Sequence, residues 1–181
     1  MSGMKKSAKT AFCGIVAALA VTIMLAAYFP FATYAVPAAA GVLFAVLTIE
    51  TGRKWAFGAY FAAAFISMLI CEKESATLFV FFFGYYPILK GIIEQRFRGF
   101  SEWLLKLLCF NAAVVAAYAV IVFAFSIPLE ESGKGGIWFT ACLLAVGNAV
   151  FIIYDIGLTR VISAYIARLH SRVARLFERG N

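Results

Sequence analysis

The sequence predicts an all-α integral membrane protein with six transmembrane helices in one compact bundle and both termini in the cytoplasm. Hydrophobic residues make up 64% of the 181 residues, whereas soluble globular chains contain about 45–50%. Charged residues make up 14%, against about 25% in soluble proteins. Because a soluble chain needs polar groups to cover its surface, this composition excludes a soluble enzyme, a disordered protein and a disulfide scaffold.

Six apolar segments are long enough to cross a bilayer, whose core of about 30 Å takes about 20 residues as an α-helix. Helices are favoured over barrel strands because the segments are long and lack alternation. Pro30 and Pro128 lie at span ends, where helices tend to stop. The predicted spans are residues 10–29, 31–49, 54–71, 76–93, 103–127 and 137–161, within a single domain of residues 1–181.

Three of these elements have particular features. The first span follows a basic N-terminus, but its apolar run exceeds the usual signal-peptide core of about 7–15 residues, so we expect a retained helix. Pro87 predicts a kink in the fourth span, because proline removes a helical hydrogen bond. Residues 162–181 read as a basic amphipathic cytoplasmic tail on anionic lipid, with docking to a cytoplasmic partner as the alternative.

The basic residues define the predicted orientation. With the N-terminus inside, all of the 16 Lys and Arg residues fall in inner segments except Lys73 and Lys134. This distribution follows the positive-inside rule. Membrane topology therefore explains the net charge of +7 better than binding to nucleic acid.

A face of small residues runs along the first span. Gly14, Ala18 and Thr22 are four residues apart, so they share one side of a helix. Such a face lets another backbone approach closely in lipid. Packing within the protein's own bundle and docking of a separate partner both remain open.

Charged groups inside a bilayer are costly and need partners. Asp155 in the sixth span and Lys90 in the fourth lie at comparable depths toward the inner side, which predicts a structural ion pair. Snorkelling of Lys90 to the headgroups and a proton relay are the alternatives. A relay is less favoured, because it needs a chain of such groups and the polar positions look scattered along the sequence.

The outer side is the predicted place for a small ligand. Aromatic residues there are expected as an interfacial belt in any membrane protein, yet they would also line a shallow cavity. The candidate ligand-binding residues are Tyr28, Tyr34, Glu72, Tyr118, Trp138 and Asn148.

Enzyme activity and bound metals are not expected. The four cysteines form no C-x-x-C motif and no cluster with histidine, so no metal site or disulfide framework is indicated. No group of His, Asp or Ser residues of catalytic type lies in or beside the spans. We therefore expect neither a catalytic residue nor a cofactor.

Six short-looped spans in 181 residues, with a basic N-terminus, resemble the substrate-binding S components of energy-coupling-factor (ECF) transporters. The face of Gly14, Ala18 and Thr22 is similar to that family's small-xxx-small motif. The resemblance implies a bacterial inner-membrane protein that binds a vitamin-like micronutrient near the outer face. Its partners would be membrane lipid, a transmembrane coupling subunit packed on the small-residue face, and two ATPase subunits.

A second hypothesis is a scaffold without a ligand. The layout is also similar to small six-span membrane components of the bacterial cell-shape machinery. Co-purification with ATPase subunits and a bound small molecule would distinguish the transporter from the scaffold.

Overall fold

The computed structural model describes residues 5–29, 32–125 and 136–170, and the regular elements in this part of the chain are all helical. The predicted all-helical class and its six helical segments are confirmed, with observed ends within about one helical turn of the predicted ones. The elements are α1 (Lys6–Leu25), η1 (Ala26–Tyr28), α2 (Ala35–Thr51), α3 (Arg53–Ile70), α4 (Lys73–Leu78), η2 (Phe79–Phe83), α5 (Tyr86–Arg96), α6 (Phe100–Phe125), α7 (Gly136–Tyr165) and η4 (Ile166–His170).

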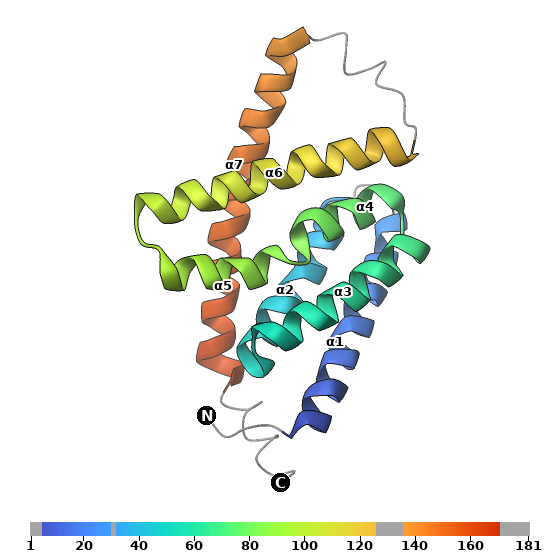
Figure 1. Cartoon of the computed structure of the whole chain (residues 1–181), viewed down its shortest axis with the longest axis vertical. Helices are drawn as coiled ribbons and strands as arrows, with labels where there is room; N and C mark the ends of the chain where they lie inside the picture. The colour runs from blue at the N-terminus through green and yellow to red at the C-terminus, as the bar shows by residue number, and fades with distance from the viewer. Residues whose placement is uncertain (1–4, 30–31, 126–135, 171–181) are drawn as a thin grey trace.

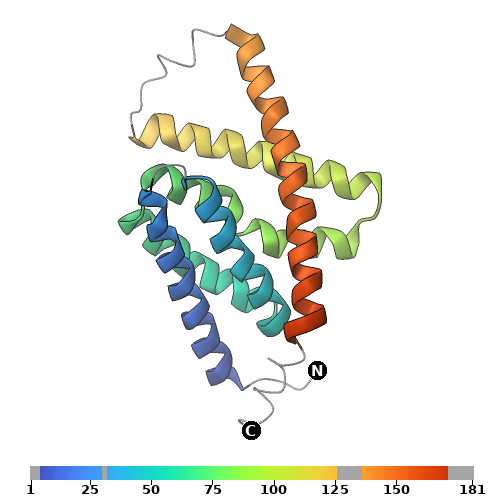
Figure 2. The ribbon, with the colours of Figure 1, turned by 180° about the vertical axis from the view of Figure 1, so that it is seen from behind.

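Helices α1, α2 and α3 pack side by side, as Figures 1 and 2 show. Alanines fill the contact, and Ala20, Ala40, Ala56 and Ala63 are fully buried. Small side chains let membrane helices approach closely, and this closeness supplies the van der Waals contact that holds them in lipid. The first half of the chain is therefore a small-residue helix bundle.

The reversals between these helices have identifiable causes. Gly52 separates α2 from α3 with a φ of 91°, a left-handed conformation that glycine adopts without a steric penalty. Glu72 begins α4, where its carboxylate accepts hydrogen bonds from the backbone N–H groups of Glu74 and Ser75 at 2.8 and 2.6 Å. This contact satisfies amides that the first turn of a helix leaves without partners.

The fourth predicted span is broken rather than kinked. The π-helical segment η2 follows α4, and the chain then turns at Gly84 and Tyr85 before α5 begins. Pro87 lies in the first turn of α5, where its missing N–H costs no hydrogen bond. The predicted kink at Pro87 is therefore wrong in its cause: the break precedes the proline, and the proline starts the next helix.

Tertiary contacts explain why the break falls at η2. The backbone of Gly41 on α2 lies so close to the carbonyl of Phe83 that any side chain there would clash. The Tyr60 hydroxyl on α3 donates a hydrogen bond to the carbonyl of Val80 at 2.5 Å. Both neighbours therefore hold the irregular segment in place.

Helix α7 does not lie parallel to its neighbours. It crosses α5 and α6 steeply, and its N-terminal half projects beyond them (Figures 1 and 2). Its 30 residues span about 45 Å, which exceeds a hydrocarbon core of about 30 Å. The predicted compact bundle thus describes α1 to α5 better than α7.

Large apolar side chains cover the outside of the molecule. Ile15, Phe65, Leu69 and Ile153 each expose two thirds or more of their surface. Soluble monomers rarely expose contiguous apolar surface on this scale. Within the described residues, four helical stretches are long and apolar enough to cross a membrane: Lys6–Tyr28, Lys73–Arg96, Phe100–Ala117 and Cys142–Arg168.

Candidate functional site

Lys90 on α5 and Asp155 on α7 meet inside the protein. The Lys90 amine lies 2.5 Å from an Asp155 carboxylate oxygen, and their side chains are only 1% and 3% exposed. The Tyr86 hydroxyl, one turn before Lys90, donates to the same oxygen at 2.6 Å. Lys90 therefore does not snorkel to the headgroups, and its charge is compensated in the interior.

The pair belongs to a larger ionic cluster, which we define as Tyr86, Lys90, Glu94, Glu102, Lys106 and Asp155. Lys106 on α6 contacts Asp155 at 3.1 Å, Glu94 at 2.7 Å and Glu102 at 2.8 Å. Lys90 also contacts Glu94 at 2.6 Å. One hydrogen-bonded cluster thus connects α5, α6 and α7.

The cluster is contiguous, although its members look scattered in the sequence. Its two lysines face three carboxylates, which gives a formal charge of −1. Glu94 and Glu102 are the exposed end, with side chains 36% and 22% exposed, whereas Asp155 and both lysines are buried. Charged groups therefore lead from the surface to Asp155.

Aromatic rings surround the buried end of the cluster. Tyr86 stacks on Phe82 with ring centroids 4.8 Å apart, and Phe151 stacks on Phe110 at the same separation. Tyr154 packs edge-to-face on Phe83. Because apolar rings lie beyond Tyr86, the cluster has the form of a buried anchor between helices rather than a path across the membrane.

Asn148 takes part in a second polar contact between α6 and α7. Its amide exchanges hydrogen bonds with Asn111 at 3.0 and 3.2 Å. Asn148 also donates to the carbonyl of Leu144 in its own helix. This candidate ligand-binding residue thus uses its side-chain groups within the protein.

The outer-side candidates divide into two groups. Tyr28, Tyr34 and Glu72 lie at the common end of α1 to α4, where Tyr28 donates to the carbonyl of Ile70 and Tyr34 donates to Glu74. The aromatic rings of Tyr28 and Tyr34 stay largely exposed. The side chains of the other two candidates, Tyr118 and Trp138, lie outside the part of the chain whose side chains the structure describes.

Glu72 is an ionised group at this end. Its partial burial opposes ionisation, but the N–H groups of Ser75 and Glu74 outweigh that effect and hold the pKa of Glu72 below its usual range. The carboxylate is therefore a fixed negative charge at neutral pH, at the same end of the helices as Tyr28 and Tyr34.

The small-residue face of α1 is exposed. Gly14, Ala18 and Thr22 all lie on the side of α1 that faces away from α2 and α3, and a side chain added at Gly14 would meet nothing within 4 Å. The opposite side of α1, which includes Ala20 and Met24, is fully buried. Packing among residues 5–29, 32–125 and 136–170 therefore does not use this face.

Sequence reasoning missed three members of the ionic cluster. Lys106 was counted with the inner basic residues, and Glu102 and Tyr86 were given no role. The four-residue spacing of Glu102 and Lys106 was the available signal, because residues at i and i+4 meet on one helical face. The partnership of Lys106 with α5 and α7 depends on helix crossing, which no local pattern gives.

The apolar helices and exposed apolar surface indicate a multi-pass helical membrane protein with a buried ionic cluster. Comparison with protein-family models, with curated proteins and with solved structures finds no match for this chain. Its function must therefore be inferred from its own residues.

Proposed function

We propose that this protein is the substrate-binding S component of an ECF-type micronutrient transporter in a bacterial cell membrane. The exposed small-residue face of α1, formed by Gly14, Ala18 and Thr22, is the observation that carries the proposal. In lipid, helix association depends on close backbone approach. A face of small side chains that stays exposed in the described part of the chain therefore suits a transmembrane coupling subunit.

The polar end of α1 to α4 supports the second half of the proposal. Exposed Tyr28 and Tyr34 lie at this end, as does the ionised Glu72. Aromatic faces together with a few oriented polar groups are common in small-molecule sites. With the N-terminus inside, this end faces outward, where a nutrient arrives.

The experiment is a substitution on the small-residue face. Ala18→Trp places a bulky ring where a partner helix would pack. We expect a tagged Ala18→Trp variant to lose co-purifying ATPase and coupling subunits from its own cell membranes by at least tenfold. Its thermal stability in detergent should stay that of the wild type, because Ala18 is exposed.

Two matched variants of α1 act as controls. Leu19→Trp changes an exposed bulky position, 48% accessible, outside the small-residue face and should keep the partners. Ala20→Trp changes a fully buried alanine and should unfold the isolated protein. If Ala18→Trp keeps the partners while Ala20→Trp unfolds the chain, the face is directed at lipid and the proposal fails. Co-purification of cell-shape proteins instead of ATPase subunits would favour the scaffold hypothesis.

A further inference from the structure

A cavity of about 680 Å³ lies where the end of α2, the start of α3, α5 and the end of α7 meet. Its lining includes the apolar side chains of Ala45, Ile49, Pro87 and Ile162. The polar side chains of the lining are those of Thr48, Thr51, Arg53, Lys54, Lys90, Glu94 and Gln95. Its volume falls within the range of about 300–1,000 Å³ that is typical of ligand sites.

Positive charge is not fully compensated among the polar side chains of the lining. The Arg53 guanidinium donates a hydrogen bond to the side-chain amide oxygen of Gln95. Because Gln95 is neutral, this contact does not compensate the positive charge of Arg53. Lys54 is the next residue and is exposed. Glu94, the acidic residue of the wall, is already within 2.6 and 2.7 Å of Lys90 and Lys106. Among the described residues that line the cavity, the charges left to meet a ligand are therefore those of Arg53 and Lys54.

The backbone adds to this preference. Helix α3 starts at the cavity, and Gly52, which precedes its first residue, has no side chain to cap the first N–H groups. Free N–H groups and the helix dipole at such an end attract negative charge. Arginine presents a planar fork of donors that matches phosphate oxygens. The wall thus offers several donors of the kind that a phosphate group takes.

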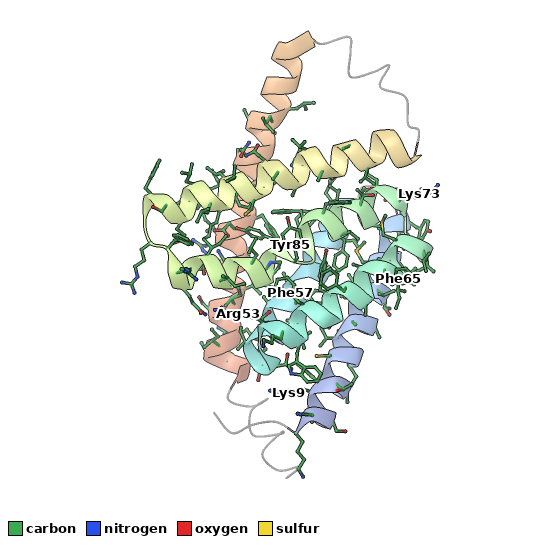
Figure 3. All side chains as sticks on the ribbon, in the orientation of Figure 1. Lys9, Arg53, Phe57, Phe65, Lys73 and Tyr85 are labelled. Carbon is green, nitrogen blue, oxygen red and sulfur yellow. The ribbon has the colours of Figure 1, made fainter. Side chains whose placement is uncertain are left out.

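We propose that this cavity binds a phosphate group, carried either by the headgroup of an anionic phospholipid or by a solute. The apolar side chains in the lining favour the lipid, because glycerol and acyl carbons would have somewhere to pack. Figure 3 shows Lys9 and Arg53 toward one end of the helices and Lys73 at the other. Basic pockets between membrane helices on the inner side commonly hold such headgroups. This site does not depend on the proposed transport role.

The test uses the full-length protein, delipidated in detergent, and measures thermal stability and bound lipid. Dioleoylphosphatidylglycerol should raise the apparent Tm and remain bound in native mass spectrometry, whereas dioleoylphosphatidylcholine should do so at least tenfold less effectively. A separate arm adds inorganic phosphate alone. Stabilisation by phosphatidylglycerol alone identifies a lipid site, and stabilisation by inorganic phosphate identifies a solute site.

Paired double variants show where binding occurs. Arg53→Gln with Lys54→Gln should lower the affinity for the stabilising probe at least tenfold. Arg160→Gln with Arg168→Gln removes the same charge from exposed positions of α7 and η4 that do not line the cavity, and should keep the wild-type affinity. Equal losses in both double variants would mean diffuse surface attraction and would overturn the proposal. Absence of any stabilisation of the wild type would overturn it independently of the variants.

Discussion

The ionic cluster predicts that neutralising Asp155 is much milder than neutralising Lys90. The wild-type cluster has two lysines and three carboxylates, so Asp155→Asn leaves two charges of each sign. The new amide oxygen can still accept from Tyr86 and Lys90, which lie 2.6 and 2.5 Å away. Lys90→Met instead leaves Lys106 alone among three carboxylates.

The magnitudes follow from the contacts. Asp155→Asn exchanges the hydrogen bonds from Tyr86 and Lys90 to a charged acceptor for neutral ones, and Lys106 loses its 3.1 Å contact with the second oxygen but keeps Glu94 and Glu102, for a total cost of about 1–2 kcal/mol. Lys90→Met breaks a buried pair and leaves uncompensated charge, which costs about 3–5 kcal/mol. At about 2–4 °C per kcal/mol for a chain of this size, the expected losses in Tm are about 2–8 °C and about 6–20 °C.

The assay is apparent Tm in one detergent at one heating rate, because membrane proteins often unfold irreversibly. The double variant Lys90→Met with Asp155→Asn should be milder than the two single effects added, since it restores the formal charge of the cluster. Arg160→Met, at an exposed position of α7 outside the ionic cluster, is the control. The reasoning is refuted if Asp155→Asn costs as much as Lys90→Met, or if neither changes Tm.

Three further predictions concern packing, capping and topology. Gly41→Ala should lower the free energy of unfolding by about 1–3 kcal/mol, because the added carbon clashes with η2. Gly14→Ala should not lower it, because the carbon added there meets nothing within 4 Å. Equal Tm values for the two variants would contradict the close approach of Gly41 to η2. Glu72→Gln should destabilise the protein at neutral pH. Because the pKa of Glu72 is lowered in the folded state, the difference in stability between variant and wild type should shrink as pH falls through that pKa. A difference that does not change with pH would argue against the cap. In a cysteine-free background, Cys at Lys73 should react with an impermeant thiol reagent from outside and Cys at Arg168 should not; the reverse labelling would invert the topology.

The Lys90–Asp155 contact was accessible from sequence for a physical reason. A lone carboxylate in a bilayer needs a partner. Counting residues along each predicted span places Lys90 at a depth comparable to that of Asp155, which made it the best candidate. Counting depth assumes that neighbouring helices run parallel. Helix α7 instead crosses both α5 and α6, and its crossing with α6 brings Lys106 to Asp155.

The break in the fourth span could not be predicted from local pattern. The run from Phe79 to Phe83 has the composition of a continuous apolar helix. The break coincides with the close approach of Gly41 and the hydrogen bond from Tyr60, both of which come from other helices. Proline, the visible signal, marked the start of the following helix.

The small face of α1 was visible in the sequence, but its orientation was not. Spacing placed Gly14, Ala18 and Thr22 together, and only the packing of α1 on α2 and α3 shows which side stays exposed. Ala20 is also a small residue and lies only two positions from Ala18, yet it packs inside the protein. Composition alone therefore could not separate a docking face from a core face.

The most direct test of the proposed role is mild purification of the tagged protein from its own cell membrane, followed by mass spectrometry of subunits and small molecules. The proposed role predicts a transmembrane coupling subunit and two ATPase subunits in fixed stoichiometry with this chain, together with a releasable vitamin-like ligand. Recovery of the intact chain without ATPase subunits and without a ligand, under conditions that preserve other membrane complexes, would contradict it.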